Sequence, residues 1–287
     1  MLFILLTGCF RGFISGQAKY QATEYHVASP RIVALKTSSV EMVGGEPVLF
    51  DALLLAPQDT EITDWRISAC GLGNETETFI WDFSSFEDDD AVRTLGQSNS
   101  MPISVAIPEL PEIKDCEEEE LAIDQLFHDH RERERNCFHY LPIRVAAKAD
   151  DSPVYAAGFL NWYPKLQEER IEKLYDTPMG IAAPDSAAAG ETIDLSFYLI
   201  PKPGSDNMEY SNFHWYVDAG ELLHTGLTAT TEMITPSADY PQGKIVTSNQ
   251  LVIPEDYQGT LRIWVVVHQA WSAGLDMNWT QWNIEVE

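Results

Sequence analysis

The stretch GEPVLFDALLL at residues 45–55 decides the fold, because the chain carries the same pattern twice. The second copy, GETIDLSFYLI, stands at residues 190–200. In each copy a Gly-Glu pair opens a segment in which apolar residues alternate with others, which is the period of a β-strand with one buried face. A tryptophan follows in both copies, Trp65 in the first and Trp215 in the second. The sequence therefore predicts two strands in each copy, one after the Gly-Glu pair and one around the tryptophan, that correspond between the copies.

Two further features follow in the same order. The motif VAIPE at residues 105–109 has a counterpart, LVIPE, at 251–255, and the alternating stretch LPIRVA at 141–146 has LRIWVV at 261–266. Four features in one order at similar spacings indicate a duplicated module. The segments between them are rich in Val, Ile, Tyr, Trp and Thr and are interrupted by Gly, Pro, Asp and Asn, which is typical of short strands joined by turns.

Many short strands without alternating helices predict β-sandwiches. The tryptophan of each copy is expected on strand C, between the two sheets. Val265 and Val267 are expected to face the core, with Trp264 and Val266 on the opposite face. This pattern resembles the Ig-like and PKD-like modules that occur in tandem in many predicted lipoproteins of Gram-negative bacteria. We therefore expect an all-β chain of two tandem Ig-like β-sandwiches, with one acidic helical insertion in the first.

The two copies also set the expected domain boundaries within the 287 residues. We expect a lipoprotein signal remnant at 1–9, a tether at 10–28, an Ig-like domain at 29–164 with its insertion at 111–137, a linker at 165–177 and a second Ig-like domain at 178–287. The linker has charged residues four positions apart and is compatible with a short helix, which Pro178 would end.

The insertion contains the strongest helix signal in the chain, at residues 115–135. Asp115 and Glu118 have the spacing of an N-cap and its partner. Four glutamates near the start and three arginines near the end suit the helix dipole. A narrow apolar stripe predicts that this helix covers one end of the sandwich. The alternative is a helix that binds a partner.

The cysteines of the first domain allow two pairings. A helix over residues 116–136 would be about 30 Å long, too long for Cys116 to reach Cys137. Cys70 ends the expected strand C and Cys137 precedes the expected strand F, and these strands are antiparallel neighbours in an Ig-like sheet. We therefore expect a disulfide between Cys70 and Cys137, with Cys116 free. A broken or shorter helix would restore the pairing of Cys116 with Cys137.

The first nine residues, MLFILLTGC, resemble a bacterial lipobox. In that class of signal the cysteine becomes the N-terminus and carries lipid, so the resemblance implies lipidation at Cys9 and attachment to a membrane. The apolar core is short and no Lys or Arg precedes it, which departs from a full signal peptide and favours a start codon further upstream. The alternative is a buried first β-strand. Phe10 follows, and by resemblance to enteric lipoproteins the absence of Asp there favours the outer membrane.

Composition and motifs argue against several classes of function. The net charge of −27 disfavours a nucleic-acid binder. On a helix His128 and His130 would point to different sides and could not share a metal ion. Neither the acidic run at 87–90 nor the pair Asp150-Asp151 has the spacing of a calcium loop. No catalytic motif is present, so we expect no enzyme, no cofactor and no metal, unless a deep pocket holds two carboxylates.

The last hairpin carries the strongest binding candidates, Trp271 and Trp279. If Trp282, Ile284 and Val286 face the core, Trp279 faces outward. Exposed aromatic rings beside a loop suit sugars or protein partners; alternatively, both rings cover the loop or the domain junction. We expect a non-catalytic cell-envelope lipoprotein that acts as a structural or protein-binding module, with a membrane and an envelope protein or glycan as partners. A carbohydrate-binding or adhesive module that uses these tryptophans is the alternative.

Overall fold

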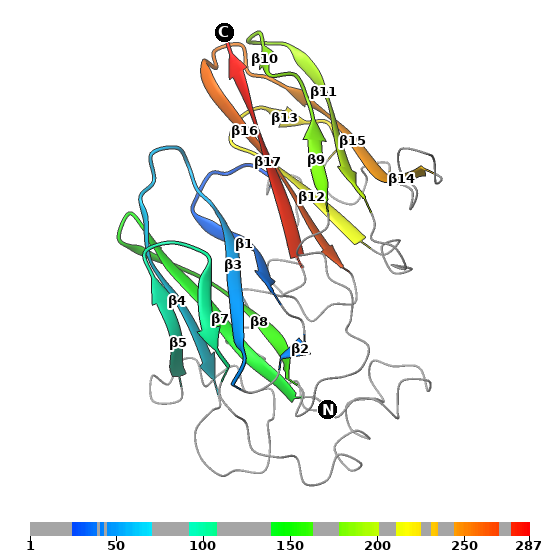
Figure 1. Cartoon of the computed structure of the whole chain (residues 1–287). Helices are drawn as coiled ribbons and strands as arrows, with labels where there is room; N and C mark the ends of the chain where they lie inside the picture. Colours follow the sequence, from blue (N-terminus) through cyan, green and yellow to red (C-terminus); the bar gives the residue numbers. More distant parts are fainter. Residues whose placement is uncertain are drawn as a thin grey trace, which may run out of the picture.

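The chain forms β-strands throughout the part that the computed structural model describes. These residues are 25–38, 41–42, 45–70, 92–107, 139–162, 178–200, 211–224, 231–234, 244–269 and 277–287. Figure 1 shows their strands in two groups, β1 to β8 and β9 to β17. The predicted helix of the insertion and the predicted linker lie outside the described residues. The prediction of an all-β fold is confirmed for the rest.

The first group is a sandwich of two sheets. One sheet holds, in order across it, β1 (Arg31–Thr37), β3 (Pro47–Leu55) and β6 (Ile103–Ala106). The other holds β2 (Glu41–Met42), β8 (Ser152–Trp162), β7 (His139–Ala149), β4 (Ile62–Cys70) and β5 (Val92–Ser98). Neighbouring strands are antiparallel apart from β2, which runs parallel to β8.

The second group is a sandwich of the same kind. One sheet holds β10 (Ser186–Ala187), β17 (Met277–Val286), β16 (Gly259–Gln269) and β12 (Ser211–Val217). The other holds β13 (Glu221–Leu222), β15 (Lys244–Val252), β11 (Thr192–Leu199) and β9 (Met179–Ala182), and β14 (Thr231–Ile234) also pairs with β15. Here β10 is the strand that runs parallel to its neighbour, β17.

The strand order identifies both sandwiches as Ig-like. In the first, β1-β3-β6 faces β2-β8-β7-β4, and in the second, β9-β11-β15 faces β10-β17-β16-β12. Each pair corresponds to strands A, B and E of an Ig-like domain opposite strands G, F and C. The short parallel strand at the edge, β2 or β10, occupies the same place in both. The two sandwiches therefore have one topology, as expected of a duplicated module.

The repeated motifs make the same contact in both sandwiches. The backbone N–H of Ile107 donates to the carbonyl of Glu46 (3.3 Å), and that of Ile253 donates to the carbonyl of Glu191 (2.9 Å). Gly45 has a φ of 82°, in the left-handed region that glycine adopts without strain. Its N–H donates back to the Ile107 carbonyl at 2.8 Å. The Gly-Glu turn and the Ile-Pro-Glu motif thus meet where strands B and E begin and end.

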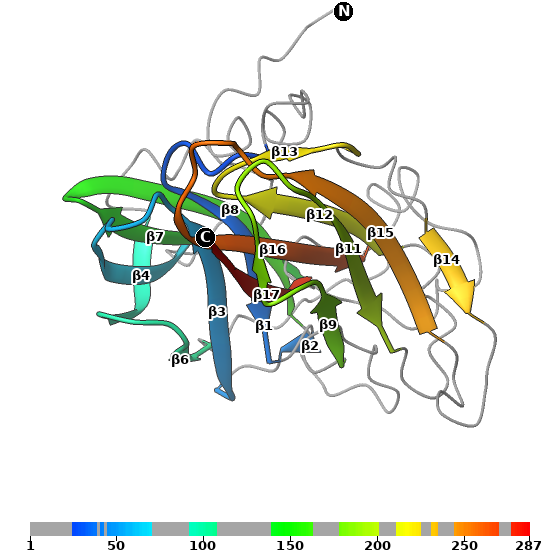
Figure 2. The same ribbon diagram turned by 90° about the horizontal axis from the view of Figure 1, so that it is seen from above.

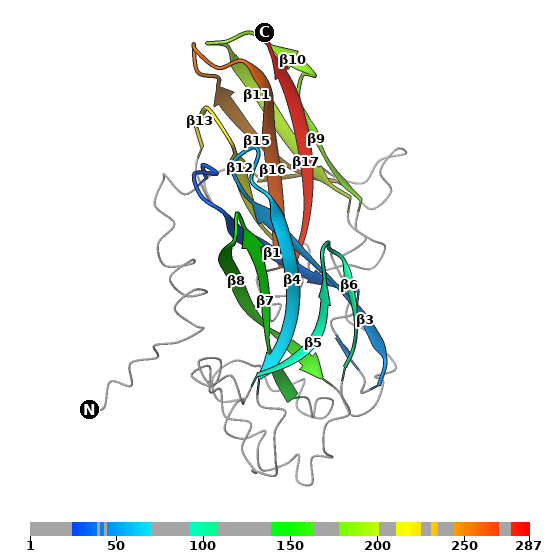
Figure 3. The same cartoon turned by 90° about the vertical axis from the view of Figure 1, so that its left-hand side faces the viewer.

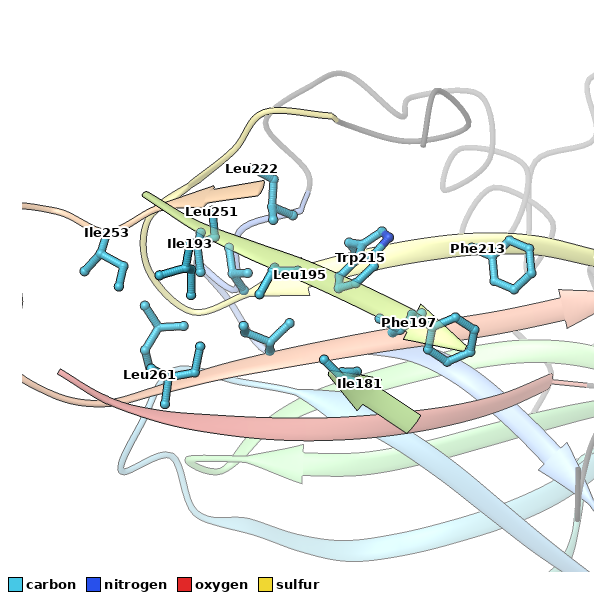
Figure 4. Close-up of a cluster of buried hydrophobic side chains, with 14 of the residues drawn as sticks. Ile181, Ile193, Leu195, Phe197, Phe213, Trp215, Leu222, Leu251, Ile253 and Leu261 are labelled. Atoms are coloured by element: carbon cyan, nitrogen blue, oxygen red, sulfur yellow. The ribbon is translucent and has the colours of Figure 1, made fainter. Parts of the chain in front are cut away.

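Each sandwich has a core filled from both of its sheets. Trp65 and Trp215 are buried on strands β4 and β12, the C strands on which we expected them. Figure 4 shows the second core, in which Trp215 lies among side chains of both sheets. Val265 and Val267 face this core, as predicted. The opposite face of β16 is also buried, and what covers it is the first sandwich.

Gly220 of the second sandwich stands at a position that does not tolerate a side chain. Its φ is 90°, and a Cβ there would lie 2.6 Å from the Val252 carbonyl oxygen and 2.8 Å from Leu251 Cδ1. We expect Gly220→Ala to lower the free energy of unfolding by about 3 kcal/mol, because left-handed strain and a clash with backbone add together. Gly190→Ala is the matched control: φ is 79°, but the nearest atom is in the flexible Glu255 side chain at 3.4 Å. Its expected cost is about 1 kcal/mol. Urea unfolding of both variants measures the difference, and equal losses would contradict the clash.

Candidate functional site at the junction of the two sandwiches

An apolar cluster joins the outer faces of two sheets, one from each sandwich. We call these residues the junction cluster. Its buried members are Val27, Ala34, Leu55, Tyr216, Trp264 and Val266, with Val33, Leu53, Met277 and Trp279 packed against them. Apart from Val27, which precedes β1, they come from β1 and β3 of the first sandwich and from β12, β16 and β17 of the second. Figures 1 and 2 show β1 beside the first residues of β17. The two sandwiches therefore share a second, smaller core.

A charged network lies at one side of the junction cluster. The Nζ atom of Lys36 is 3.7 Å from Asp51 Oδ2 and donates a hydrogen bond to Asn278 Oδ1 at 3.3 Å. The same ammonium lies 4.0 Å from the centre of the Trp279 ring, a favourable cation–π arrangement. Burial lowers the pKa of Lys36 from its ordinary value, and Asp51 offsets part of this effect. A cation of the first sandwich is thus held by residues of both.

A second polar network fixes the loop between β3 and β4 to the second sandwich. Arg262 donates from Nε to Asp218 Oδ2 (2.7 Å) and from Nη2 to the carbonyl of Ala56 (3.0 Å). The backbone N–H of Arg262 also donates to Asp218, at 2.9 Å. Gln58 reaches across in the other direction and donates to the Thr260 carbonyl at 2.7 Å. The nearly buried Asp218 carboxylate accepts one hydrogen bond from the Arg262 guanidinium and one from the Arg262 backbone, and this charged contact orients the guanidinium toward the first sandwich.

Residues 25–28, which we call the N-terminal strap, form a third link. The backbone N–H of Val27 donates to the Val217 carbonyl, and the N–H of Val217 donates to the Tyr25 carbonyl, both at 3.0 Å. His26 thereby pairs in parallel with Val217 at the end of β12. Val27 is buried in the junction cluster. Three residues after the strap, Arg31 begins β1, so the chain touches the second sandwich before it starts the first.

The strap takes up the last four residues of the predicted tether at 10–28. Tyr25 packs against the core of the second sandwich, and its ring lies 4.5 Å from that of His26. Burial lowers the pKa of His26, although Glu221 acts in the other direction, and burial raises the pKa of Tyr25. Residues 25–28 therefore belong to the folded body. The only sequence signal that these residues are folded is the alternation of the apolar Tyr25 and Val27 around a polar residue, His26.

The structure places some of the predicted site residues and not others. Cys9, Cys116, Cys137 and Trp271 lie outside the described residues. Cys70 ends β4 as predicted, and β4 pairs antiparallel with β7, the strand that Cys137 precedes. The Cys70–Cys137 disulfide stays a prediction. Trp279 is half-buried against the junction cluster, with its ring next to Lys36.

The described part of the chain offers neither a metal site nor a membrane-spanning helix. Within it, no three or more His, Cys, Asp or Glu side chains are grouped so that they could hold a metal ion. The same residues include no helix with the length and apolarity needed to cross a membrane.

The chain matches no protein-family model and no curated protein sequence. Among solved structures it is similar to the fibronectin(III)-like modules of Clostridium thermocellum CbhA, with 11% identity, a TM-score of 0.25 and coverage of 90% of this chain and 94% of that one. It is also similar to a protein from Corynebacterium diphtheriae described as membrane-anchored, with 12% identity, a TM-score of 0.25 and coverage of 90% and 53%. Because these TM-scores are low, the Ig-like assignment rests on the strand order alone.

Removing the charge of Asp218 tests the second network. We expect Asp218→Asn to lower the free energy of unfolding by about 1–3 kcal/mol, because Arg262 then keeps its partly buried charge without a counter-ion. Asp64→Asn is the control, since Asp64 pairs with Lys148 at 2.6 Å on the open surface. An exposed pair contributes little, so the unfolding midpoint should hardly move. Chemical denaturation of both variants measures this, and an equal loss from Asp64→Asn would contradict it.

A charge in the strap tests the third link. Val27 is 4% exposed, whereas its neighbour Ala28 faces solvent. We expect Val27→Asp to lower the free energy of unfolding by about 2–3 kcal/mol, because the carboxylate is desolvated without a partner or else the strap is released. Ala28→Asp should leave stability nearly unchanged. Limited proteolysis near residue 26, together with urea unfolding, separates the two. Equal behaviour of both variants would mean that the strap does not stabilise the junction.

Proposed function

We propose that this chain is a non-catalytic cell-envelope lipoprotein, held to a membrane by lipid on Cys9, whose two Ig-like sandwiches act together as one rigid structural or protein-binding module. The junction is the observation that supports a rigid module. Tandem domains usually move relative to one another unless the interface between them is large and apolar. Here an apolar cluster, two polar networks and a backbone strap all connect the two sandwiches.

A fixed junction has a direct consequence for binding. Loops at the ends of Ig-like sandwiches are common recognition sites, because the strands hold them in place. When the two sandwiches cannot rotate, loops from both are presented at a constant separation, and a partner that contacts both does not have to order them. Less conformational entropy is then lost on binding. This favours an envelope protein as the partner. The residue after Cys9 is Phe10 and not Asp, which favours the outer membrane as the location.

The junction also accounts for Trp279 without a ligand. Its ring is half-buried, and the ammonium of Lys36 lies at its face. A sugar-binding tryptophan needs that face free for stacking. The carbohydrate-binding alternative therefore has less support than a protein-binding or structural role.

Lipidation is the part of this proposal that can be tested first. We expect the protein made in a Gram-negative host, from its gene with the upstream sequence, to give a mature chain that begins at Cys9 and carries added acyl mass. It should partition into detergent, and Cys9→Ser should abolish both properties. Cys70→Ser is the matched control and should keep the lipid. Intact-mass measurement and detergent phase separation report the result, and an unmodified, detergent-independent chain would overturn the lipoprotein assignment. Cross-linking in the envelope then identifies the partner.

A further inference from the structure

The strap is where the described part of the chain begins, and we call its position the entry point. Its residues lie along the end of β12, an edge strand of the second sandwich, and Val27 is buried between the two sandwiches. The Nη2 atom of Arg31 donates to the His26 carbonyl at 3.1 Å, which ties the strap to the first residue of β1. The entry point is therefore neither end of the body. It lies at the junction, in contact with both sandwiches.

The two far ends of the body lie away from this entry point. In Figures 1 and 3, β10 and the C-terminus are at one end of the elongated body and β5 is toward the other, where Figure 1 also places β2. Strand β12 and the first part of β1 lie between them. A chain that leaves through the strap thus leaves from the middle of the long axis.

The number of residues before the strap limits how far the body can be from the anchor. Tyr25 stands sixteen positions after Cys9 in the sequence. A fully extended chain spans at most about 3.4 Å per residue, so the junction lies within roughly 55 Å of the lipid attached to Cys9.

Charge gives no reason for one sandwich to approach a membrane before the other. The formal charge is −15 over residues 1–175 and −12 over residues 176–287, which together make the −27 of the whole chain. Both halves are therefore repelled by anionic lipids to a similar degree. Because charge does not distinguish the two sandwiches, we take the entry point of the tether as the feature that orients the body.

We infer that the lipid tether leaves the body at the junction, beside β12, so that the lipid surface faces the middle of the molecule and both sandwiches stand at similar distances from it. The inference rests on the proposed lipidation of Cys9. Sequence order alone suggests a different arrangement, in which the first sandwich stands next to the membrane and the second is carried furthest away. In the arrangement inferred here, loops from both ends of the body reach partners at the same depth in the envelope.

Energy transfer to a membrane dye distinguishes the two arrangements. The acylated protein is reconstituted on phosphatidylcholine vesicles that contain an acceptor-labelled lipid, and a donor is introduced as an unnatural amino acid at one exposed residue at a time. Glu46 and Glu191 form a matched pair, because each follows the repeated glycine before strand B and they lie at opposite ends of the body. Ala28, exposed in the strap, reports the entry point.

We expect the strongest transfer from Ala28 and weaker, similar transfer from Glu46 and Glu191. Strong transfer from Glu46 with little from Glu191 would overturn the inference in favour of the sequential arrangement, and the reverse would overturn it as well. In both of these cases the proposed lipidation would stand, because intact mass shows the acyl group on Cys9. If mass shows no acyl group, the lipoprotein proposal fails, and the inference fails with it.

Discussion

The burial of β16 on both faces is the constraint on which the described structure depends. Residues 263–267 of this strand are at most 3% exposed, on both faces of the sheet. One set of side chains fills the core of the second sandwich, and the other set, Trp264 and Val266, belongs to the junction cluster. Without the first sandwich, this outer face would be an exposed apolar patch of the kind that stable monomeric domains rarely carry. The second sandwich therefore depends on the first for the burial of its own surface.

The polar contacts of the junction add orientation to this apolar attraction. Dispersion and burial alone tolerate sliding of one sheet over another, because they have little directional preference. Hydrogen bonds do have a direction, and the Arg262 guanidinium connects Asp218 on one side to a backbone carbonyl on the other. The Lys36 ammonium likewise connects Asp51 of the first sandwich to Asn278 of the second. Because these contacts stand at separate places around the apolar cluster, they fix both the position and the angle of the two sheets.

Sequence reasoning predicted the fold well and the junction poorly, for a physical reason. Strands and their buried faces follow from a period of two within short stretches, so the duplicated sandwiches and the faces of Val265 and Trp264 could be derived. The junction brings Lys36 next to residues more than 240 positions away, and no local period encodes such a contact. Trp279 was correctly expected on the face away from the core, and its contact with the first sandwich agrees with the alternative that its ring covers the domain junction. The strap was missed because two apolar residues are too few to distinguish a strand from a tether.

The difference between the two copies contains information that the repeat itself does not. Strand F is β7 in the first sandwich and β16 in the second, and the inward residues of both are apolar and buried. The outward residues differ: Arg144 and Ala146 on β7 correspond to Trp264 and Val266 on β16 in the aligned motifs. Duplicated modules begin with the same outer face, so a change from polar or small residues to large apolar ones in one copy indicates where that copy is covered. Comparing the outward positions of the copies, rather than their shared pattern, would have located the junction from the sequence.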